Sequence, residues 1–147
     1  MRDKSAYRPY DFYGGPFSNF ADSTIFIDVG FGTKSYPTVE HAFQAAKAVT
    51  LEEHDQVRSA PGPGYAKMQG REIKLRDDWE RVKYDVMLEC LRAKFALPSF
   101  KGRLLSTGDR ELREDSPTDF VWGYRNNGQN LLGKALMQIR EELRNDS

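Results

Sequence analysis

The sequence predicts an α+β fold that is predominantly helical, with a small N-terminal β-hairpin packed on a helical bundle in one compact domain over residues 1–147. Two segments, 79–95 and 131–143, place apolar residues at helical spacing. The stretch 24–36 combines β-branched and aromatic residues with a glycine turn, as hairpins do. No repeat, low-complexity tract or linker-like composition divides the chain, and its length is about that of one domain.

The first structured element expected is the hairpin. Residues 1–23 are rich in aromatic and turn-forming residues, and they precede two short strands at 24–29 and 34–36. Gly30-Phe31-Gly32 would form the turn between these strands.

A helix is predicted to start after Pro37, with Thr38 as its N-cap, because a threonine hydroxyl can accept a free backbone N–H of the first turn. Its core-facing residues would be Val39, Ala42, Phe43, Ala46 and Val49. On an adjoining face Glu40, Gln44 and Lys47 follow at i, i+4 and i+7, so this polar edge can line a cleft.

Further helices are expected along the rest of the chain. After a loop at 60–64, the stretch 65–70 predicts a short helix closed by Gly70. A long helix would start after Asp77 or Asp78 and end before Pro98. Its apolar stripe contains Trp79, Val82, Val86, Met87, Cys90, Leu91, Ala93 and Phe95.

The C-terminal third begins with a helical turn or two at 100–105, followed by a turn at 107–109. The segment 120–123 fits either a short strand or a loop, and Asn127-Gly128 predicts another turn. The last helix would start near Asn130. Its buried side would carry Leu131, Leu132, Ala135, Leu136, Ile139 and Leu143.

The charge balance limits the kinds of partner. Lys and Arg number 22, as do Asp and Glu, so no long-range field of one sign would draw the protein to nucleic acid or to an anionic membrane. Any basic site must therefore be local. No stretch resembles a secretory signal or approaches the ~18 apolar residues of a membrane span, so we expect a cytoplasmic protein without a membrane partner.

Metal and thiol chemistry are not expected. His41, His54 and Cys90 have no metal-ligand spacing, so the sequence predicts no metal site and no cofactor. Cys90 is the only cysteine, which rules out an internal disulfide, and its place on an apolar stripe favours an inert buried thiol.

Carboxylates and cations in polar segments remain as candidates for catalysis. Glu40 lies near a helix start, where the helix dipole favours its ionised form. Asp119 fits either a catalytic acid or a residue that organises a turn, and Trp122 fits either a binding surface or the core. Lys67 and Arg71, four residues apart, fit either a phosphate grip or a solvated basic face.

Taken in order, these segments resemble one family. The matching stretches are 17–20 (FSNF), 36–47 (YPTVEHAFQAAK), 66–71 (AKMQGR), Asp78-Trp79, Val86-Met87, Lys94-Phe95, 104–109 (LLSTGD), 112–119 (LREDSPTD), Trp122-Gly123 and 128–137 (GQNLLGKALM). On these residues, in a match that runs from Gly15 to Leu143, the sequence resembles the NADAR, or YbiA-like, N-glycosidase family.

The resemblance implies a metal-independent enzyme that cleaves the C–N bond at the anomeric carbon of a ribose. The implied substrates are phosphoribosyl intermediates of riboflavin synthesis, or ADP-ribose attached to guanine in nucleic acid. It ties Glu40, Asp119, Trp79 and Trp122 to activity. The implied substrate pocket contains Asn19, Phe20, Lys67, Gly70, Arg71 and Asn130, to which we add Lys47 from the polar helix edge and Gly123 from the motif.

Such a reaction passes through an oxocarbenium-like state, which two carboxylates can serve. Glu40 would stabilise the cation or activate water, and Asp119 would orient the ribose hydroxyls or protonate the leaving base. Trp122 or Phe20 would stack on the base, and Lys67 with Arg71 would hold a phosphate. In an alternative mechanism Lys67 forms a Schiff base with the ribose. An alternative function is that of a sensor, which binds ADP-ribose without cleaving it. The oligomeric state is not predicted.

Overall fold

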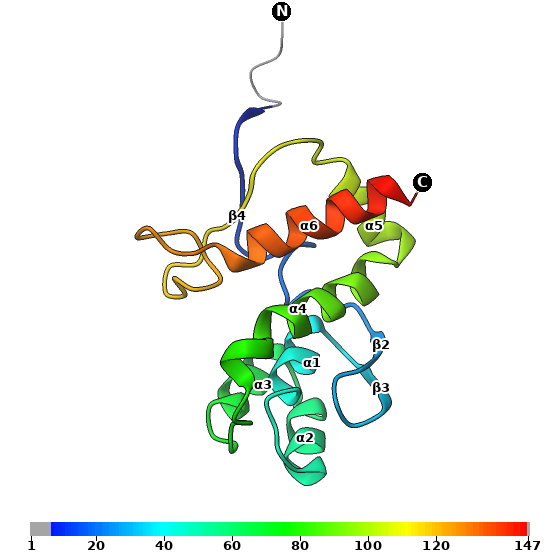
Figure 1. The fold of residues 1–147 in the computed structure, drawn as a ribbon, viewed down its shortest axis with the longest axis vertical. Coiled ribbons are helices and arrows are strands. Elements are labelled where there is room, and N and C mark those ends of the chain that lie inside the picture. The colour runs from blue at the N-terminus through cyan, green and yellow to red at the C-terminus, as the bar shows by residue number, and fades with distance from the viewer. Residues whose placement is uncertain (1–6, 147) are drawn as a thin grey trace, which may run out of the picture. The chain divides into compact units, whose positions relative to one another are not determined.

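Short local elements make up the described part of the chain, which is residues 7–146 of the computed structural model (Figure 1). In order they are β1 (Tyr10–Phe12), β2 (Ile25–Asp28), β3 (Thr33–Tyr36), α1 (Val39–Ala45), α2 (Leu51–Arg58), α3 (Pro63–Gly70), α4 (Trp79–Phe95), α5 (Pro98–Leu105), β4 (Leu112–Glu114) and α6 (Leu131–Asn145). The fold is thus mostly helical α+β with small two-stranded sheets, as predicted.

The described residues form two compact units. Unit 2 is Asn19–Lys94, and unit 1 combines 7–18 with 95–146. The expectation of one domain over the whole chain stays a prediction.

In unit 2 the predicted hairpin is confirmed. Strands β2 and β3 pair antiparallel, with Ile25 opposite Tyr36 and Asp28 opposite Thr33. The Asp28 carboxylate accepts backbone N–H groups of Gly30 and Gly32, at 2.8 and 3.2 Å. Both glycines have positive φ, 118° and 85°, which explains why glycine serves this turn. Strand β3 also contacts α1, so the hairpin packs on a helix.

Helix α1 starts as predicted but ends early. The Thr38 hydroxyl accepts the backbone N–H of His41 at 3.1 Å, which confirms the N-cap. The expected extension to Val49 is wrong, because the helix ends at Ala45 and Ala48 forms a β-bridge with Leu75. Val49 is consequently 48% exposed rather than in the core.

Helix α2 was not predicted. It buries only His54 and Val57, so its apolar pattern is too sparse to signal a helix. The available signal was a cap: Thr50 precedes Glu53 by three residues, and its hydroxyl accepts the Glu53 backbone N–H at 3.2 Å.

Helix α3 begins at Pro63, two residues before the predicted start. The helix ends at Gly70 as predicted, but Gly70 is not its C-cap, because Arg71 takes that position with ordinary right-handed backbone. A glycine is needed there for close packing, since a Cβ at Gly70 would clash with Gln44 of α1. Helices α1, α2 and α3 pack on one another in unit 2.

Helix α4 ends before Pro98 as predicted, and its stripe buries Trp79, Met87, Cys90, Leu91 and Phe95. Val82, Val86 and Ala93 are only half-buried. The backbone carbonyl of Asp78 accepts the Val82 N–H, while its carboxylate pairs with Arg76 at 2.5 and 2.9 Å.

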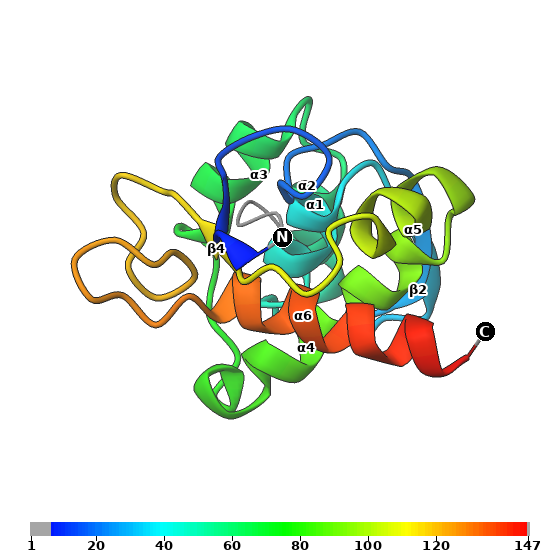
Figure 2. The same cartoon turned by 90° about the horizontal axis from the view of Figure 1, so that it is seen from above.

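Unit 1 contains an unexpected parallel pair, β1 with β4, in which Tyr10 lies opposite Leu112. Helix α6 contacts β4 and α5, and Figure 2 shows α5 beside its C-terminal half. The buried face of α6 includes the predicted Leu132, Ala135, Leu136 and Ile139, whereas Leu131 and Leu143 are half-buried. Residues 120–123 form turns rather than a strand, and the turn at Gly108 has a φ of 63°.

Candidate active site

In unit 2 the predicted site residues Asn19, Glu40 and Gly70 form a cluster with Gln44, which we call the Glu40 cluster. Helix α1 places Gln44 one turn after Glu40, and the Gln44 amide donates to Glu40 Oε1 at 2.7 Å. The Glu40 backbone N–H donates to the Asn19 carbonyl at 3.1 Å. Glu40 and Gln44 are 7% and 5% exposed, so this carboxylate is held in an almost dry environment.

Two buried oxygens of the cluster have no hydrogen-bond partner among the described residues: Asn19 Oδ1 and Gln44 Oε1. The Asn19 amide nitrogen contacts Met87 Sδ at 3.7 Å, which leaves its oxygen open. A buried acceptor without a donor costs about 1–3 kcal/mol, so unpaired acceptors concentrate where a ligand supplies the donor. Ribose hydroxyls or a base N–H would be suitable donors. The sequence placed Gln44 on the cleft edge, at i+4 from Glu40, without assigning it a role.

Lys47 and Trp79 meet beyond the end of α1. The Trp79 ring lies 5.0 Å from the Phe43 ring, and Lys47 Nζ lies 5.8 Å from the centre of the Trp79 ring. This distance is within cation–π range. Trp79 is almost fully buried, so it packs as a core residue and its predicted contact with substrate stays a prediction.

Lys67 and Arg71 lie at the end of α3. Lys67 is in the last turn and half-buried, and Arg71 is exposed. Neither side chain forms a hydrogen bond or ion pair with any residue in 7–146. Both are therefore available to an anion, and their role as a phosphate grip stays a prediction.

The second group is in unit 1, where Asp119 organises a turn. Its Oδ1 accepts the backbone N–H groups of Val121 and Trp122, each at 3.0 Å, and its own N–H donates to Ser116 Oγ at 2.9 Å. Oδ1 of Asp119 thus organises the turn, which was one of the two roles expected for this residue. Oδ2 accepts no hydrogen bond from the described residues. Gly123 lacks a side chain because a Cβ would clash with the Asp119 carbonyl oxygen.

Asn130 connects α6 to β4 in unit 1. It has left-handed backbone, with a φ of 52°. Its side-chain amide donates to the Leu112 carbonyl at 2.9 Å and accepts the Glu114 N–H at 3.1 Å. Asn130 therefore positions the start of α6, and its predicted contact with substrate stays a prediction.

The predicted residues thus fall into two sets. Unit 2 contains Asn19, Phe20, Glu40, Lys47, Lys67, Gly70, Arg71 and Trp79, and unit 1 contains Asp119, Trp122, Gly123 and Asn130. The structure brings Asn19, Glu40 and Gly70 together within one unit. That Glu40 and Asp119 serve one cleft stays a prediction.

Lys94 is a buried cation to which the sequence pattern assigns no role. It is 0% exposed, and this burial lowers its pKa to about 7. Lys94 lies one helical turn after Cys90 on α4. The pKa of the Cys90 thiol is raised, mainly by burial and then by the charges of Glu89 and Glu40. The missed signal was a lysine at i+4 from a cysteine on an apolar stripe.

The histidines serve the structure. His41 contacts Thr38 Oγ1 at 2.8 Å and the Ala60 carbonyl at 2.9 Å, and His54 contacts the Tyr36 hydroxyl at 2.7 Å and the Ala45 carbonyl at 2.8 Å. Within residues 7–146, no three His, Cys, Asp or Glu side chains are grouped as metal ligands would be. None of the helices in this range combines the length and the apolar character that a membrane crossing requires.

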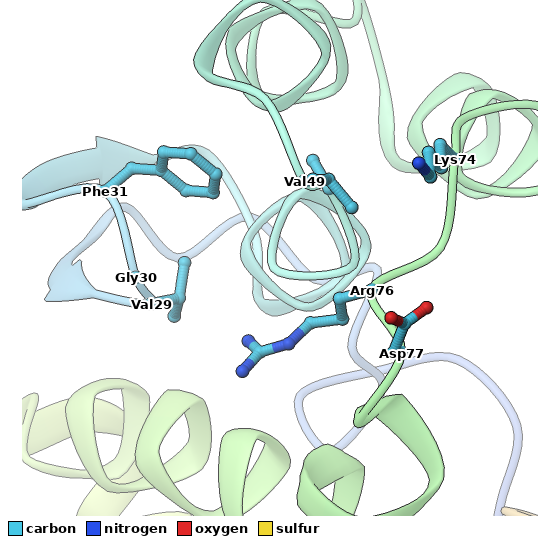
Figure 3. Close-up of a pocket in the computed structure, with 8 residues that line it drawn as sticks. Val29, Gly30, Phe31, Val49, Lys74, Arg76 and Asp77 are labelled. Atoms are coloured by element: carbon cyan, nitrogen blue, oxygen red, sulfur yellow. The ribbon is translucent and has the colours of Figure 1, made fainter.

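A hollow of about 350 Å³ lies elsewhere in unit 2 (Figure 3). It is lined by Val29, Gly30, Phe31, Ala48, Val49, Lys74, Arg76 and Asp77, none of which is a predicted site residue. Figure 3 shows the Arg76 guanidinium pointing away from Asp77. Because Arg76 pairs with Asp78, the cations of this hollow are balanced by neighbouring carboxylates.

Sequence comparison gives the class of protein. The chain is 39% identical over 142 residues to the N-glycosidase YbiA of Escherichia coli, covering 93% of this chain and 86% of that protein. It is 40% identical over 147 residues to an N-glycosidase of Nostoc punctiforme, covering 95% of this chain and 89% of that protein. An NMR structure of E. coli YbiA matches with a TM-score of 0.83 at 37% identity, covering 95% of this chain and 86% of that one. The expected fold and enzyme class, an N-glycosidase, are confirmed.

The family follows from the domain match. The NADAR domain model matches residues 7–144, so the chain belongs to the NADAR family. The chain is also 35% identical over 155 residues to the maize riboflavin biosynthesis protein PYRR, covering 95% of this chain and 25% of that protein. This match links the family to the riboflavin pathway.

Proposed function

We propose that this protein hydrolyses the C–N bond at the anomeric carbon of a ribose, without a metal ion. The observation that carries the proposal is the Glu40 cluster, in which a nearly buried carboxylate lies beside unpaired acceptors. Cleavage of a ribosyl C–N bond builds positive charge on the sugar, and a fixed negative charge in a dry site stabilises it strongly.

Glu40 would act as the electrostatic partner of the sugar or as the base that activates water. Its hydrogen bond from Gln44 fixes the carboxylate at the start of α1, where it would face the sugar or the water. The open oxygens of Asn19 and Gln44 would accept hydrogen bonds from the ribose hydroxyls or the base.

Asp119 would contribute through Oδ2, because Oδ1 already holds the turn that carries Trp122. It would orient the ribose hydroxyls or protonate the departing base. Trp122 or Phe20 would stack on that base, an interaction worth about 1–3 kcal/mol. Lys67 and Arg71 would hold a phosphate of the substrate, Arg71 through its planar fork.

Two substrates fit this chemistry: a phosphoribosyl intermediate of riboflavin synthesis, and guanine carrying ADP-ribose in nucleic acid. The maize PYRR relative supports the first, and the neutral net charge does not oppose either. In the decisive experiment the protein is incubated with ribosylaminouracil phosphate and, separately, with an ADP-ribosylated guanine oligonucleotide. We expect released base or restored oligonucleotide in one assay, and Glu40→Gln should slow that turnover strongly.

A lysine would allow a second mechanism for the same reaction. A neutral amine attacks the anomeric carbon, the bond to the base nitrogen breaks, and opening of the ribose ring gives an imine that water hydrolyses. Lys67 is the lysine for this role, because it is half-buried and its side chain pairs with no residue in 7–146. Lys94, by contrast, is 0% exposed.

Borohydride distinguishes the two mechanisms, since it reduces an imine to a stable adduct. With a lysine mechanism, intact-mass analysis during turnover should show a protein–sugar adduct in wild type but not in Lys67→Met. Turnover without any adduct in wild type would support direct hydrolysis. Binding of ADP-ribose without turnover of either substrate would support the sensor alternative instead.

A further inference from the structure

Unit 1 contains a hollow that the proposed reaction does not use. Its volume is about 170 Å³, and we call it the Arg103–Arg110 hollow. It is lined by Tyr10, Pro16, Phe17, Arg103, Ser106, Thr107 and Arg110. No carboxylate is among these lining residues of the described chain, in contrast to the charge-balanced hollow of unit 2.

Neither of the two lining arginines forms an ion pair with a carboxylate of the described residues. Arg103 is exposed, and its guanidinium forms no hydrogen bond or ion pair with residues 7–146. Arg110 donates to the carbonyls of Arg8 and Pro9, at 2.8 and 3.2 Å, and lies 5.0 Å from the centre of the Tyr10 ring. Neutral carbonyls and a ring face position this guanidinium without neutralising it.

A third arginine adds positive charge next to the hollow. Arg140 of α6 is only 6% exposed, and it donates to Thr107 Oγ1 at 2.8 Å and to the Arg110 carbonyl at 2.9 Å. The nearby carboxylates of Asp109 and Glu141 pair with a different cation, Arg144, at 3.1 and 3.5 Å. The hollow is therefore a local basic site on a chain without net charge.

We propose that the Arg103–Arg110 hollow binds a backbone phosphate of the nucleic-acid strand that carries the substrate base. This inference rests on the proposed function and selects its nucleic-acid substrate. Guanidinium groups bind phosphate oxygens through paired hydrogen bonds, and Ser106 adds a hydroxyl. The volume is below the ~300 Å³ of ordinary small-molecule pockets, so the hollow suits one phosphate rather than a nucleotide.

Exposed aromatic side chains that neighbour Tyr10 in the sequence support the same partner. Tyr7 and Tyr13 flank Tyr10 in sequence, and each is 62% exposed. Single-stranded nucleic acids are bound by basic grooves combined with exposed aromatic rings on which bases stack.

The test measures binding without turnover. Fluorescence anisotropy with a labelled, unmodified guanine-containing single-stranded oligonucleotide is compared for wild type, Arg103→Ala and the control Arg81→Ala. Arg81 is also an exposed arginine, with a side chain 80% exposed and outside the hollow. We expect about tenfold weaker binding in Arg103→Ala and a log–log salt slope smaller by about 0.7, with wild-type values for Arg81→Ala. Equal affinities and slopes for Arg103→Ala and wild type would overturn the proposal.

A second arm identifies the source of the phosphate. Titration with inorganic phosphate, followed by backbone amide NMR signals of residues 106–110, reports a site for free phosphate. If those signals move while oligonucleotide affinity is unchanged in Arg103→Ala, the hollow is a free-phosphate site and the strand assignment is wrong. Failure of the proposed function has a different signature: neither substrate is cleaved, whereas Arg103→Ala still weakens oligonucleotide binding.

Discussion

At Glu40, burial and hydrogen bonding act in opposite directions. Removing a carboxylate from water disfavours its charge, whereas the Gln44 amide and the first turn of α1 favour it. The carboxylate is thus fixed in a dry place where its field on a bound sugar is strong.

Glu40→Gln should separate charge from structure. Glutamine keeps the size of the side chain and an oxygen that can accept from Gln44, so thermal unfolding should change little. Without the negative charge, kcat should fall by about 10²- to 10⁴-fold. Steady-state kinetics alongside a thermal melt check both, and full activity in the variant would remove Glu40 from the mechanism.

Asp119 can be tested with a matched pair of variants. Asp119→Asn retains an Oδ1 acceptor for the N–H groups of Val121 and Trp122, so stability should be kept while activity falls. Asp119→Ala leaves both N–H groups without this partner and should cost about 1–3 kcal/mol of unfolding free energy as well. Wild-type turnover in Asp119→Asn would show that the residue only organises the turn.

How far a single residue's role can be predicted differs within the site. The i+4 spacing of Glu40 and Gln44 correctly indicated one helix edge, because helical geometry is local. The part played by Asn130 could not be predicted, since it depends on left-handed backbone and on two hydrogen bonds to a strand that lies far along the chain.

At the scale of elements, the contact between α1 and α3 connects packing to the candidate site. Gly70 of α3 lies against the Gln44 side chain, which in turn holds Glu40. The position of one helix therefore sets the orientation of the carboxylate on the other.

Gly70→Ala should displace Gln44 and weaken the Glu40 contact. We expect a loss of about 1–3 kcal/mol in unfolding free energy and a reduced kcat. Gly64→Ala is the control in the same helix, because a Cβ there meets nothing within 4 Å. That control should keep its activity and gain up to about 1 kcal/mol from helix propensity. Equal kinetics for the two variants would contradict this assignment.

Elements with strong local patterns were predictable, and elements formed by distant partners were not. The β2–β3 hairpin and the Thr38 cap follow from residues adjacent in sequence. The β1–β4 pair joins two three-residue strands about 100 residues apart, and nothing local marks either as a strand. Helix α1 ended early because of the bridge between Ala48 and Leu75, which is likewise a long-range contact.

At the scale of the whole molecule, the buried Tyr36–His54 pair makes stability depend on pH. Burial is the main cause that lowers the pKa of His54, and burial likewise raises the pKa of Tyr36 to about 12. His54 therefore binds a proton more readily in the unfolded chain than in the folded one. Its contribution to stability is present above the ordinary histidine pKa of about 6.5 and is lost as the pH falls below that value.

Chemical denaturation between pH 7 and pH 5 should thus show a falling unfolding free energy. The variant His54→Gln should be less stable at pH 7, because it loses the contacts to Tyr36 and Ala45, but its pH dependence over this range should be smaller. Parallel curves for the two proteins would assign the pH dependence to other groups.

The lone, buried Cys90 makes the folded protein unreactive toward thiol reagents, because burial both blocks access and raises its pKa. A disulfide reagent added to the native enzyme would modify only molecules in which α4 has opened. The rate of that modification would measure how often this helix is exposed, with no label introduced and no competing cysteine to correct for.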